Sequence, residues 1–207
     1  MINENKVQKL NKFLKNNDPL SIIEKSLKLS GDAILTTNFR PYEASILHSV
    51  CSVKYDLPIV WCDTGYNTKQ TYIHAEYLIS LLNLNIFLYV PKQTVAHRES
   101  TIGVPNIEDP QHKLFTEQVK LEPFKRALEY HKPKIWFTNL RKGQTDYRDS
   151  LDIFSLTKEG ILKVCPFYYW TDKDLDSYLD KNNLPNEFNY VDPTKSVQNR
   201  ECGLHFK

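Results

Sequence analysis

The stretch "DAILTTNFRPYEASILHSVCSVKYDLPIVWCDTGY", residues 32–66, decides the fold. Residues 32–37 form an apolar run that predicts a short buried strand, and the segment 40–55 predicts a helix with Pro41 near its start. A second apolar run, 57–63, predicts another strand that ends in the turn "DTGY". A strand, a helix and a strand in this order indicate parallel strands joined by a crossover helix.

The same alternation continues along the chain and predicts an α/β fold with a mostly parallel sheet flanked by helices. Helices are predicted over residues 5–16, 19–29, 69–82, 122–130 and 171–182, and strands or extended segments over 84–90, 134–140 and 160–170. Asp18 and Thr171 precede two of these helices as N-cap residues. The stretch 91–116 shows no clear period and is predicted to be a long irregular loop, a kind of segment that is often functional or mobile.

Size and composition indicate one ordinary globular domain. The 207 residues can bury a core of their own, and a formal net charge of +2 argues against a nucleic-acid coat or a polybasic membrane anchor. No apolar run approaches the roughly 20 residues that cross a bilayer, and the first residues lack the apolar stretch of a signal peptide. A cytoplasmic protein is expected. The histidines show no spacing typical of metal ligands, so no metal site is predicted.

Ligands of open α/β sheets bind beyond the carboxyl ends of the strands. The first candidate segment there consists of Thr36, Thr37, Asn38 and Phe39. Its hydroxyls and amides, at the N-terminus of the following helix, could hold a phosphate. Neither GxxxxGK[ST] nor GxGxxG occurs in the chain, so a Walker loop and a Rossmann fingerprint are both excluded. The alternative is a plain turn capped by Asn38.

The second candidate segment is Asp63, Thr64 and Gly65, at the end of the second strand. Asp63 could accept hydrogen bonds from a ribose or an amine, and Gly65 would let a ligand approach the backbone. The alternative is a tight turn without a ligand.

The third candidate segment, "NLRKGQTDYR" (residues 139–148), follows a buried strand. It contains Arg141, Lys142, Gln144 and Arg148. Cations and an amide at this density suit a phosphate or a sulfate, because a guanidinium group pairs with two oxygens at once. The alternative is a solvated basic loop.

The chain has four cysteines, Cys51, Cys62, Cys165 and Cys202. They form no CxxC pair, which argues against a zinc ribbon or a dithiol redox motif. The first three fall in apolar contexts, where a free thiol packs as a small hydrophobe. Cys202 differs because Arg200 and His205 flank it, and nearby positive charge favours the thiolate that acts as a nucleophile.

With these motifs in this order, the chain resembles the phosphoadenylyl-sulfate (PAPS) reductases, relatives of the adenylyl-sulfate (APS) reductases and of ATP-pyrophosphatase-type enzymes. "TTNFRPYEASILH" is similar to the modified pyrophosphate loop of that family, and "DTGY" to its second nucleotide loop. "KLEPFKRAL" resembles a helix motif before the fourth strand, and "LRKGQTDYR" resembles the phosphate-binding segment. "ECGLH" resembles the terminal motif whose cysteine is the nucleophile.

The resemblance implies an adenine nucleotide alpha hydrolase-like fold. It divides the chain into a nucleotide-binding domain, 1–183, with N-terminal helices, and a mobile C-terminal tail, 184–207, that carries the catalytic cysteine. It further implies that Cys202 attacks PAPS and forms a Cys-S-sulfonate, from which thioredoxin or glutaredoxin releases sulfite in assimilatory sulfate reduction. Arg200 and His205 would stabilise the thiolate or the sulfonate, and Lys163 would help to balance the phosphates. A homodimer is also implied.

The iron–sulfur cluster of related APS reductases is not expected here. Their Cys-Cys pair corresponds to Phe115 and Thr116, and a four-iron cluster needs four thiolates. This favours PAPS over APS as the substrate. Three alternatives stay open: a cluster-free APS reductase, an ATP-using adenylating enzyme of the same fold, and a nucleotide-binding module without catalysis. Two departures from the family pattern are a short linker before "ECGLH" and the pair Arg40-Pro41 in the pyrophosphate loop.

Overall fold

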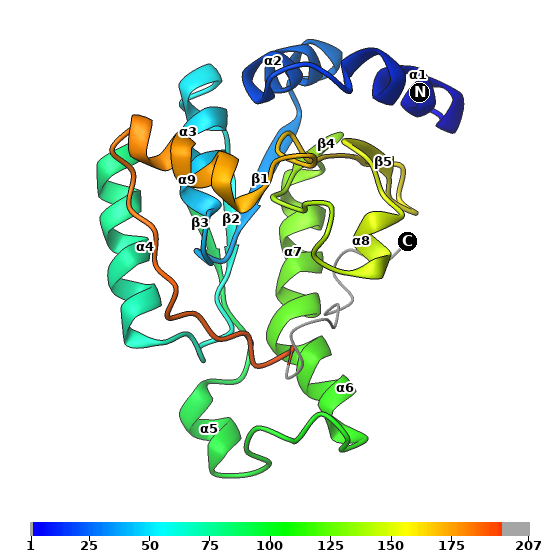
Figure 1. Ribbon diagram of the computed structural model, residues 1–207. Helices are drawn as coiled ribbons and strands as arrows, with labels where there is room; N and C mark the ends of the chain where they lie inside the picture. Colours follow the sequence, from blue (N-terminus) through cyan, green and yellow to red (C-terminus); the bar gives the residue numbers. More distant parts are fainter. Residues whose placement is uncertain (1, 196–207) are drawn as a thin grey trace.

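The computed structural model describes residues 2–195 as a sheet with helices on both faces (Figure 1). The strands are β1 (Ala33–Thr37), β2 (Ile59–Cys62), β3 (Ile86–Tyr89), β4 (Ile135–Phe137), β5 (Phe154–Leu156) and β6 (Leu162–Val164). The helices are α1 (Glu4–Leu14), α2 (Pro19–Leu29), α3 (Glu43–Val53), α4 (Lys69–Leu82), α5 (Val95–Glu99), α6 (Gln111–Thr116), α7 (Glu122–His131), α8 (Asp146–Asp149) and α9 (Asp172–Lys181). A π-helical turn, η1 (Glu117–Leu121), joins α6 to α7.

The six strands form one sheet in the order β3-β2-β1-β4-β6-β5, which confirms the predicted α/β class. All neighbouring strands are parallel except β5 and β6, which are antiparallel. After β1 the chain adds β2 and β3 on one side, and it then places β4 on the other side of β1. The crevice beyond β1 and β4 is therefore the switch point, where sheets of this kind bind ligands.

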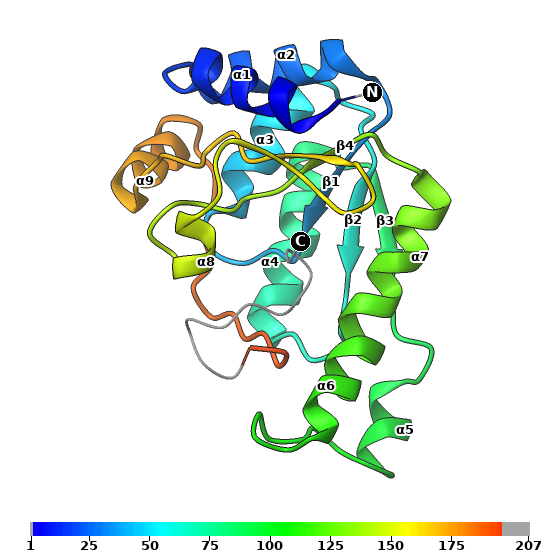
Figure 2. The ribbon, with the colours of Figure 1, turned by 90° about the vertical axis from the view of Figure 1, so that its right-hand side faces the viewer.

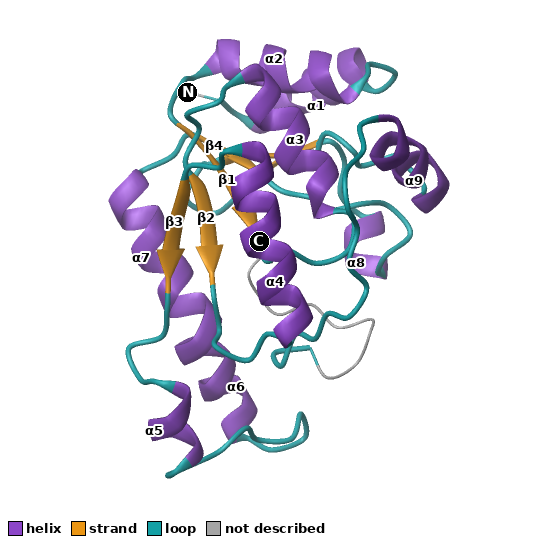
Figure 3. Ribbon diagram, turned by 90° about the vertical axis from the view of Figure 1, so that its left-hand side faces the viewer, coloured by secondary structure: helices purple, strands orange, loops and turns teal. Residues whose placement is uncertain are grey.

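Alternate residues of the strands pack against different helices. Leu35 and Ile59 join the larger core, which includes residues of α3 and α4, whereas Ile34 and Val60 join a smaller cluster with Phe124 of α7. Figure 3 shows α4 on the viewer's side of the sheet, next to β2, and α7 on the far side. This alternation follows from the two-residue period of a strand and makes the sheet buried on both faces.

Local capping accounts for several helix starts that the sequence predicted correctly. The carboxylate of Asp18 accepts a hydrogen bond from the backbone N–H of Ser21 (3.0 Å) at the start of α2, with Pro19 in the first helical position. Thr171 and Asp174 form a capping box at the start of α9. None of the helices among residues 2–195 combines the length and apolar composition needed to cross a membrane.

Three local predictions were wrong. Residues 91–116 contain α5 and α6, which lie beyond the carboxyl ends of the strands (Figure 2). The predicted helix at 40–55 begins only at Glu43, because Tyr42 has a left-handed backbone (φ 69°) and Pro41 precedes it. The antiparallel strand β5 was not predicted at all, since its three residues are too few to show a period.

Residues 184–195, called the strap below, run from the end of α9 to the carboxyl ends of the strands (Figure 1). The amide oxygen of Asn186 accepts a hydrogen bond from the backbone N–H of Tyr42 (2.8 Å), and the carbonyl of Asn189 accepts one from Thr68 (2.7 Å). The strap is thus fixed to the starts of α3 and α4. The predicted mobility of the tail from residue 184 onward stays a prediction.

Candidate active site

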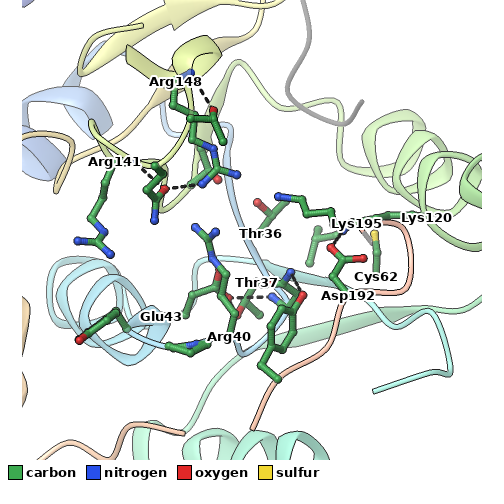
Figure 4. Close-up of a pocket in the computed structure, with 18 of the residues that line it drawn as sticks. Thr36, Thr37, Arg40, Glu43, Cys62, Lys120, Arg141, Arg148, Asp192 and Lys195 are labelled. Carbon is green, nitrogen blue, oxygen red and sulfur yellow. Dashed lines mark hydrogen bonds and ion pairs between the residues drawn. The ribbon is translucent and has the colours of Figure 1, made fainter. Parts of the chain in front are cut away.

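A cavity of about 630 Å³ lies beyond the carboxyl ends of β1, β2 and β4. Its walls come from the strand ends, the β1–α3 turn (residues 38–42), the basic loop (residues 141–148) and the strap (Figure 4). The charged residues that line it are Arg40, Glu43, Lys120, Arg141, Arg148, Asp172, Asp192 and Lys195. Five cations and three carboxylates give these walls an excess of positive charge, in a volume typical of small-molecule sites.

The β1–α3 turn is organised around the carboxylate of Glu43, which is 5% exposed. One oxygen accepts hydrogen bonds from the hydroxyl of Thr37 (2.6 Å) and the backbone N–H of Asn38 (2.9 Å). The other oxygen accepts from Nε of Arg40 (3.0 Å), and Arg40 also donates to the carbonyl of Asn139. The turn therefore contains its own anion.

Asn38 joins this turn to the strap. When its amide is oriented so that the nitrogen faces Glu43, its oxygen accepts a hydrogen bond from the hydroxyl of Tyr190 (2.5 Å). Burial raises the pKa of Tyr190 above its ordinary value, so this hydroxyl keeps its proton and acts as the donor.

The basic loop holds two arginines that are both less than a tenth exposed, Arg141 and Arg148. Arg148 donates to the amide oxygen of Gln144, which also accepts from the backbone N–H of Arg141 (3.1 Å). Arg141 forms an ion pair with Asp172 (2.6 Å), whose side chain is 64% exposed. The loop thus supports its guanidinium groups with a neutral amide and with a carboxylate that water screens.

The strap contributes a buried ion pair between Asp192 and Lys120 of η1. Thr194 donates from its hydroxyl (2.6 Å) and from its backbone N–H (3.0 Å) to the same carboxylate. Burial raises the pKa of Asp192, but the charge and hydrogen bond of Lys120 and the hydrogen bonds of Thr194 outweigh this and lower the pKa below its ordinary value. The Asp192 carboxylate is therefore ionised at neutral pH.

The structure brings together six of the twelve predicted site residues that it describes. The residues that line the cavity are Thr36, Thr37, Asn38, Arg141, Gln144 and Arg148. The predicted residues placed elsewhere are Phe39, Asp63, Thr64, Gly65, Lys142 and Lys163. The remaining three, Arg200, Cys202 and His205, lie outside the described residues.

Two of the predicted residues are buried in the protein interior and do not line the cavity. Phe39 is fully buried and packs edge-on against Trp61, with ring centroids 4.8 Å apart. Lys163 is also buried, and its ammonium group lies 5.2 Å from the centre of the Trp136 ring. Lys142 is exposed, as the alternative of a solvated loop predicts for this one residue.

The polar side chain of Asp63, in the turn after β2, is hydrogen-bonded to other residues of that turn and to the start of α4. The carboxylate of Asp63 accepts hydrogen bonds from the backbone N–H of Gly65 (2.9 Å), the amide of Asn67 (2.8 Å) and the hydroxyl of Tyr72 (3.0 Å). Gly65 has a positive φ of 82°, and a Cβ atom there would lie 2.5 Å from Val95. Glycine is thus required by the backbone and by close packing of α5, which favours the alternative of a turn without a ligand.

Three of the four cysteines are described, and burial raises the pKa of each thiol. The pKa is about 11 for Cys51 and Cys165 and about 12 for Cys62. Cys51 and Cys165 belong to the larger core or pack against it, whereas Cys62 lines the cavity. At neutral pH all three are protonated and therefore poor nucleophiles.

Sequence reasoning missed other residues of the cavity wall, among them Arg40, Glu43, Lys120, Tyr190, Asp192 and Lys195. Lys120 opens the motif "KLEPFKRAL", so its position in the motif was a usable signal. Arg40 was noted only as a departure from the family pattern. The strap residues carry no local signal, because only the fold brings them to the strand ends.

Comparison with known proteins gives one consistent result. The model of the phosphoadenosine phosphosulfate reductase domain matches residues 33–189. A phosphoadenosine 5'-phosphosulfate reductase of Vibrio cholerae is 34% identical over 205 residues, covering 86% of this chain and 79% of that protein.

Solved structures share the fold at lower identity. The phosphoadenylyl-sulfate reductase of Candida auris, in a phosphate complex, has a TM-score of 0.79 with 21% identity and covers 90% of both chains. The FMN adenylyltransferase of Candida glabrata, bound to FMN and an ATP analogue, has a TM-score of 0.60 with 15% identity, covering 82% of this chain and 56% of that one. The two structures support the adenine nucleotide alpha hydrolase-like fold.

Proposed function

The chain belongs to the phosphoadenosine phosphosulfate reductase family, a family of oxidoreductases, and from this premise we propose that it reduces PAPS to sulfite and releases adenosine 3',5'-bisphosphate. The observation that carries the proposal is the cavity at the sheet's switch point, with five cations in its described walls. The phosphates of PAPS are anionic, so a cationic cavity of nucleotide size suits it.

The proposed chemistry proceeds in three steps. The Cys202 thiolate attacks the sulfur of the sulfate group, an S–S bond forms, and the S–O bond to the nucleotide breaks with its electron pair on the bisphosphate. One thiolate of a small dithiol protein then attacks the Cys202 sulfur and displaces sulfite. The second thiolate of that protein then attacks the mixed disulfide and displaces the Cys202 thiolate, so the dithiol protein ends as a disulfide and has supplied, overall, the two electrons that reduce the sulfur.

The described residues have a binding role in this proposal. Arg148 and Arg141 would hold phosphate oxygens, because their guanidinium groups are buried in the cavity wall and can bind two oxygens at once. Lys120 lies on the opposite side of the cavity (Figure 4), where the buried carboxylate of Asp192 balances its charge, so its contribution to phosphate binding would be smaller than that of the two arginines. Thr36 would orient the nucleotide at the end of β1, whereas the hydroxyl of Thr37 already donates to Glu43.

Two observations support Cys202 as the nucleophile. The other three thiols have raised pKa values and are protonated at neutral pH. Cys202 follows Lys195, a residue of the cavity wall, by seven residues, and a chain of seven residues spans at most about 25 Å. The sequence separation therefore allows Cys202 to approach the cavity.

The test measures sulfite release from PAPS and from APS, with thioredoxin and its reducing system supplied, and, separately, adenylation of an acceptor by ATP. Release from PAPS alone is expected. Release from APS alone would favour the cluster-free APS reductase, and adenylation of an acceptor by ATP would favour the adenylating enzyme. If none of these nucleotides is turned over, the remaining alternative is a nucleotide-binding module without catalysis.

Cys202→Ser is expected to lower sulfite release by at least about a thousandfold, since serine is a far weaker nucleophile, while nucleotide binding is retained. Cys62→Ser is the matched control, because it removes a thiol that lines the cavity. It should leave substantial activity, apart from a packing loss of about 1 kcal/mol. Full activity in Cys202→Ser would contradict the mechanism.

The proposal includes no iron–sulfur cluster, because the chain has four cysteines in all, and Cys51 lies in α3, Cys62 in β2 and Cys165 directly after β6. Protein purified without oxygen is expected to show negligible iron and no visible absorption band. Stoichiometric iron with labile sulfide would contradict this and shift the substrate assignment toward APS. The family resemblance further supports three parts of the proposal: thioredoxin or glutaredoxin as the reductant, a homodimer, and a cytoplasmic location.

A further inference from the structure

The β1–α3 turn has the position of an anion-binding turn, but its donors are used inside the protein. The backbone N–H of Asn38 donates to Glu43 (2.9 Å), and that of Phe39 donates to the hydroxyl of Thr37 (3.1 Å). The hydroxyl of Thr37 in turn donates to Glu43 (2.6 Å). A phosphate in this turn would have to compete for groups that are already paired.

Residues 41–43 also have no free backbone N–H for a ligand, because each N–H is either missing or already hydrogen-bonded. Pro41 has no backbone N–H, and the N–H of Tyr42 donates to the amide oxygen of Asn186 in the strap (2.8 Å). The N–H of Glu43 donates to the carbonyl of Arg40 (3.2 Å). The backbone of this turn therefore offers few donors to a ligand.

Glu43 occupies the centre of this arrangement. Its carboxylate accepts hydrogen bonds from a hydroxyl, a backbone N–H and the Nε of Arg40, which is the kind of donor set that holds a phosphate oxygen. The side chain is 5% exposed, so water screens its charge weakly. A second anion brought into this turn would meet a fixed negative charge.

We propose that Glu43 is a specificity-determining residue: it fills the anion position of the β1–α3 turn and so excludes pyrophosphate and the phosphate chain of ATP. The nucleotide phosphates are left to the basic loop. The inference rests on the proposed function only in taking the cavity to bind an adenine nucleotide. It explains how a fold shared with an ATP-binding adenylyltransferase can bind a different nucleotide.

The test is binding of inorganic pyrophosphate, measured by calorimetry in magnesium-free buffer. Glu43→Ala frees the turn donors and Arg40, and it is expected to bind pyrophosphate at least about tenfold more tightly than the wild type. Glu43→Gln keeps the shape of the side chain but removes its charge, so a smaller gain of about threefold is expected. Adding Arg40→Ala to Glu43→Ala should abolish most of the gain, which places the new site at this turn.

Glu122→Ala is the matched control. Glu122 is also the first residue of a helix and also accepts a hydrogen bond from an arginine, Nε of Arg126 (2.9 Å), but it does not line the cavity. Its pyrophosphate affinity should stay within about twofold of the wild type. Circular dichroism checks that each variant is folded; if Glu43→Ala is not, Glu43→Gln decides.

Pyrophosphate affinities of Glu43→Ala and Glu43→Gln that equal that of the wild type would overturn the inference. So would gains of the same size in Glu122→Ala. Sulfite release by the wild type is measured independently, so failure of this inference is distinguishable from failure of the proposed reaction.

Discussion

Two walls of the same cavity, the β1–α3 turn and the basic loop, support their arginines in opposite ways. In the turn, Arg40 is paired with the buried carboxylate of Glu43. In the basic loop, Arg148 donates to the neutral amide of Gln144, and Arg141 is paired with a largely exposed carboxylate. A guanidinium held by a neutral or screened partner keeps more of its charge for a ligand than one held by a buried anion. An arginine at a strand end is therefore not enough for an anion site, because the charge of its partner also matters.

The strap supplies a third arrangement, in which the cation and the carboxylate of an ion pair are both buried. Breaking this ion pair is expected to have the largest effect. Lys120→Met leaves the Asp192 carboxylate, 6% exposed, without its cation. Removal of one partner of a buried pair costs about 3 kcal/mol, so the free energy of unfolding from urea denaturation should fall by about that amount.

Two variants sharpen this prediction. Lys120→Met/Asp192→Leu should regain most of the lost stability, because no buried charge is left unpaired. Lys54→Met breaks an exposed pair with Asp56 and should cost less than about 1 kcal/mol. Equal losses in Lys120→Met and Lys54→Met would show that the strap pair is not buried in solution.

The second prediction concerns the basic loop. Arg148→Ala should weaken binding of adenosine 3',5'-bisphosphate by about tenfold to a hundredfold, because it removes charge-assisted hydrogen bonds worth about 1.5–3 kcal/mol. Lys142→Ala is the control: Lys142 is the exposed cation of the same loop, and its removal should change affinity by less than about threefold. Calorimetry measures the affinity of each variant. Equal losses of affinity in the two variants would mean that the loop attracts the nucleotide only through its overall positive charge.

A smaller effect is expected from salt. The 3'-phosphate adds negative charge, so between about 0.05 and 0.5 M salt the bisphosphate should lose more affinity than adenosine 5'-monophosphate. Titrations of the wild type at the two salt concentrations measure the difference. The same loss for both nucleotides would mean that the 3'-phosphate is not held by the cations of the cavity.

The smallest expected effect is the loss of stability in acid, and it concerns two histidines outside the cavity wall. Burial lowers the pKa of His48 in α3 and of His74 in α4, so the unfolded chain binds protons more readily than the fold does. Their contribution is fully present above the ordinary histidine pKa and is lost as pH falls below it. Tm should decrease by a few degrees between pH 7.5 and 5.5, and His74→Gln should reduce that decrease. A Tm that rises on acidification would contradict the sign.

The sequence predicted the parts of the fold that local chemistry determines. Helix α4 begins and ends where its period predicts, and Asp18 and Thr171 cap helices as expected, because capping acts within a few residues. The short helices α5 and α6 were missed because five or six residues show less than two turns of a period.

The site was harder to predict than the fold, because burial and partners depend on distant parts of the chain. Phe39 stands beside cavity residues in sequence, but its side chain turns into the core. Asp63 has the right position for a ligand contact, but Asn67 and Tyr72 already donate to it. Lys120 and Asp192 are 72 residues apart and meet only because the strap returns to the strand ends.

The most direct test of the account is the structure of the protein bound to adenosine 3',5'-bisphosphate. Phosphate oxygens are expected within hydrogen-bond distance of Arg148 or Arg141, about 2.7–3.2 Å, with the Glu43 carboxylate still bound to Thr37 and to the backbone of Asn38. A phosphate bound to the N–H of Asn38, with Glu43 displaced from the turn, would contradict it.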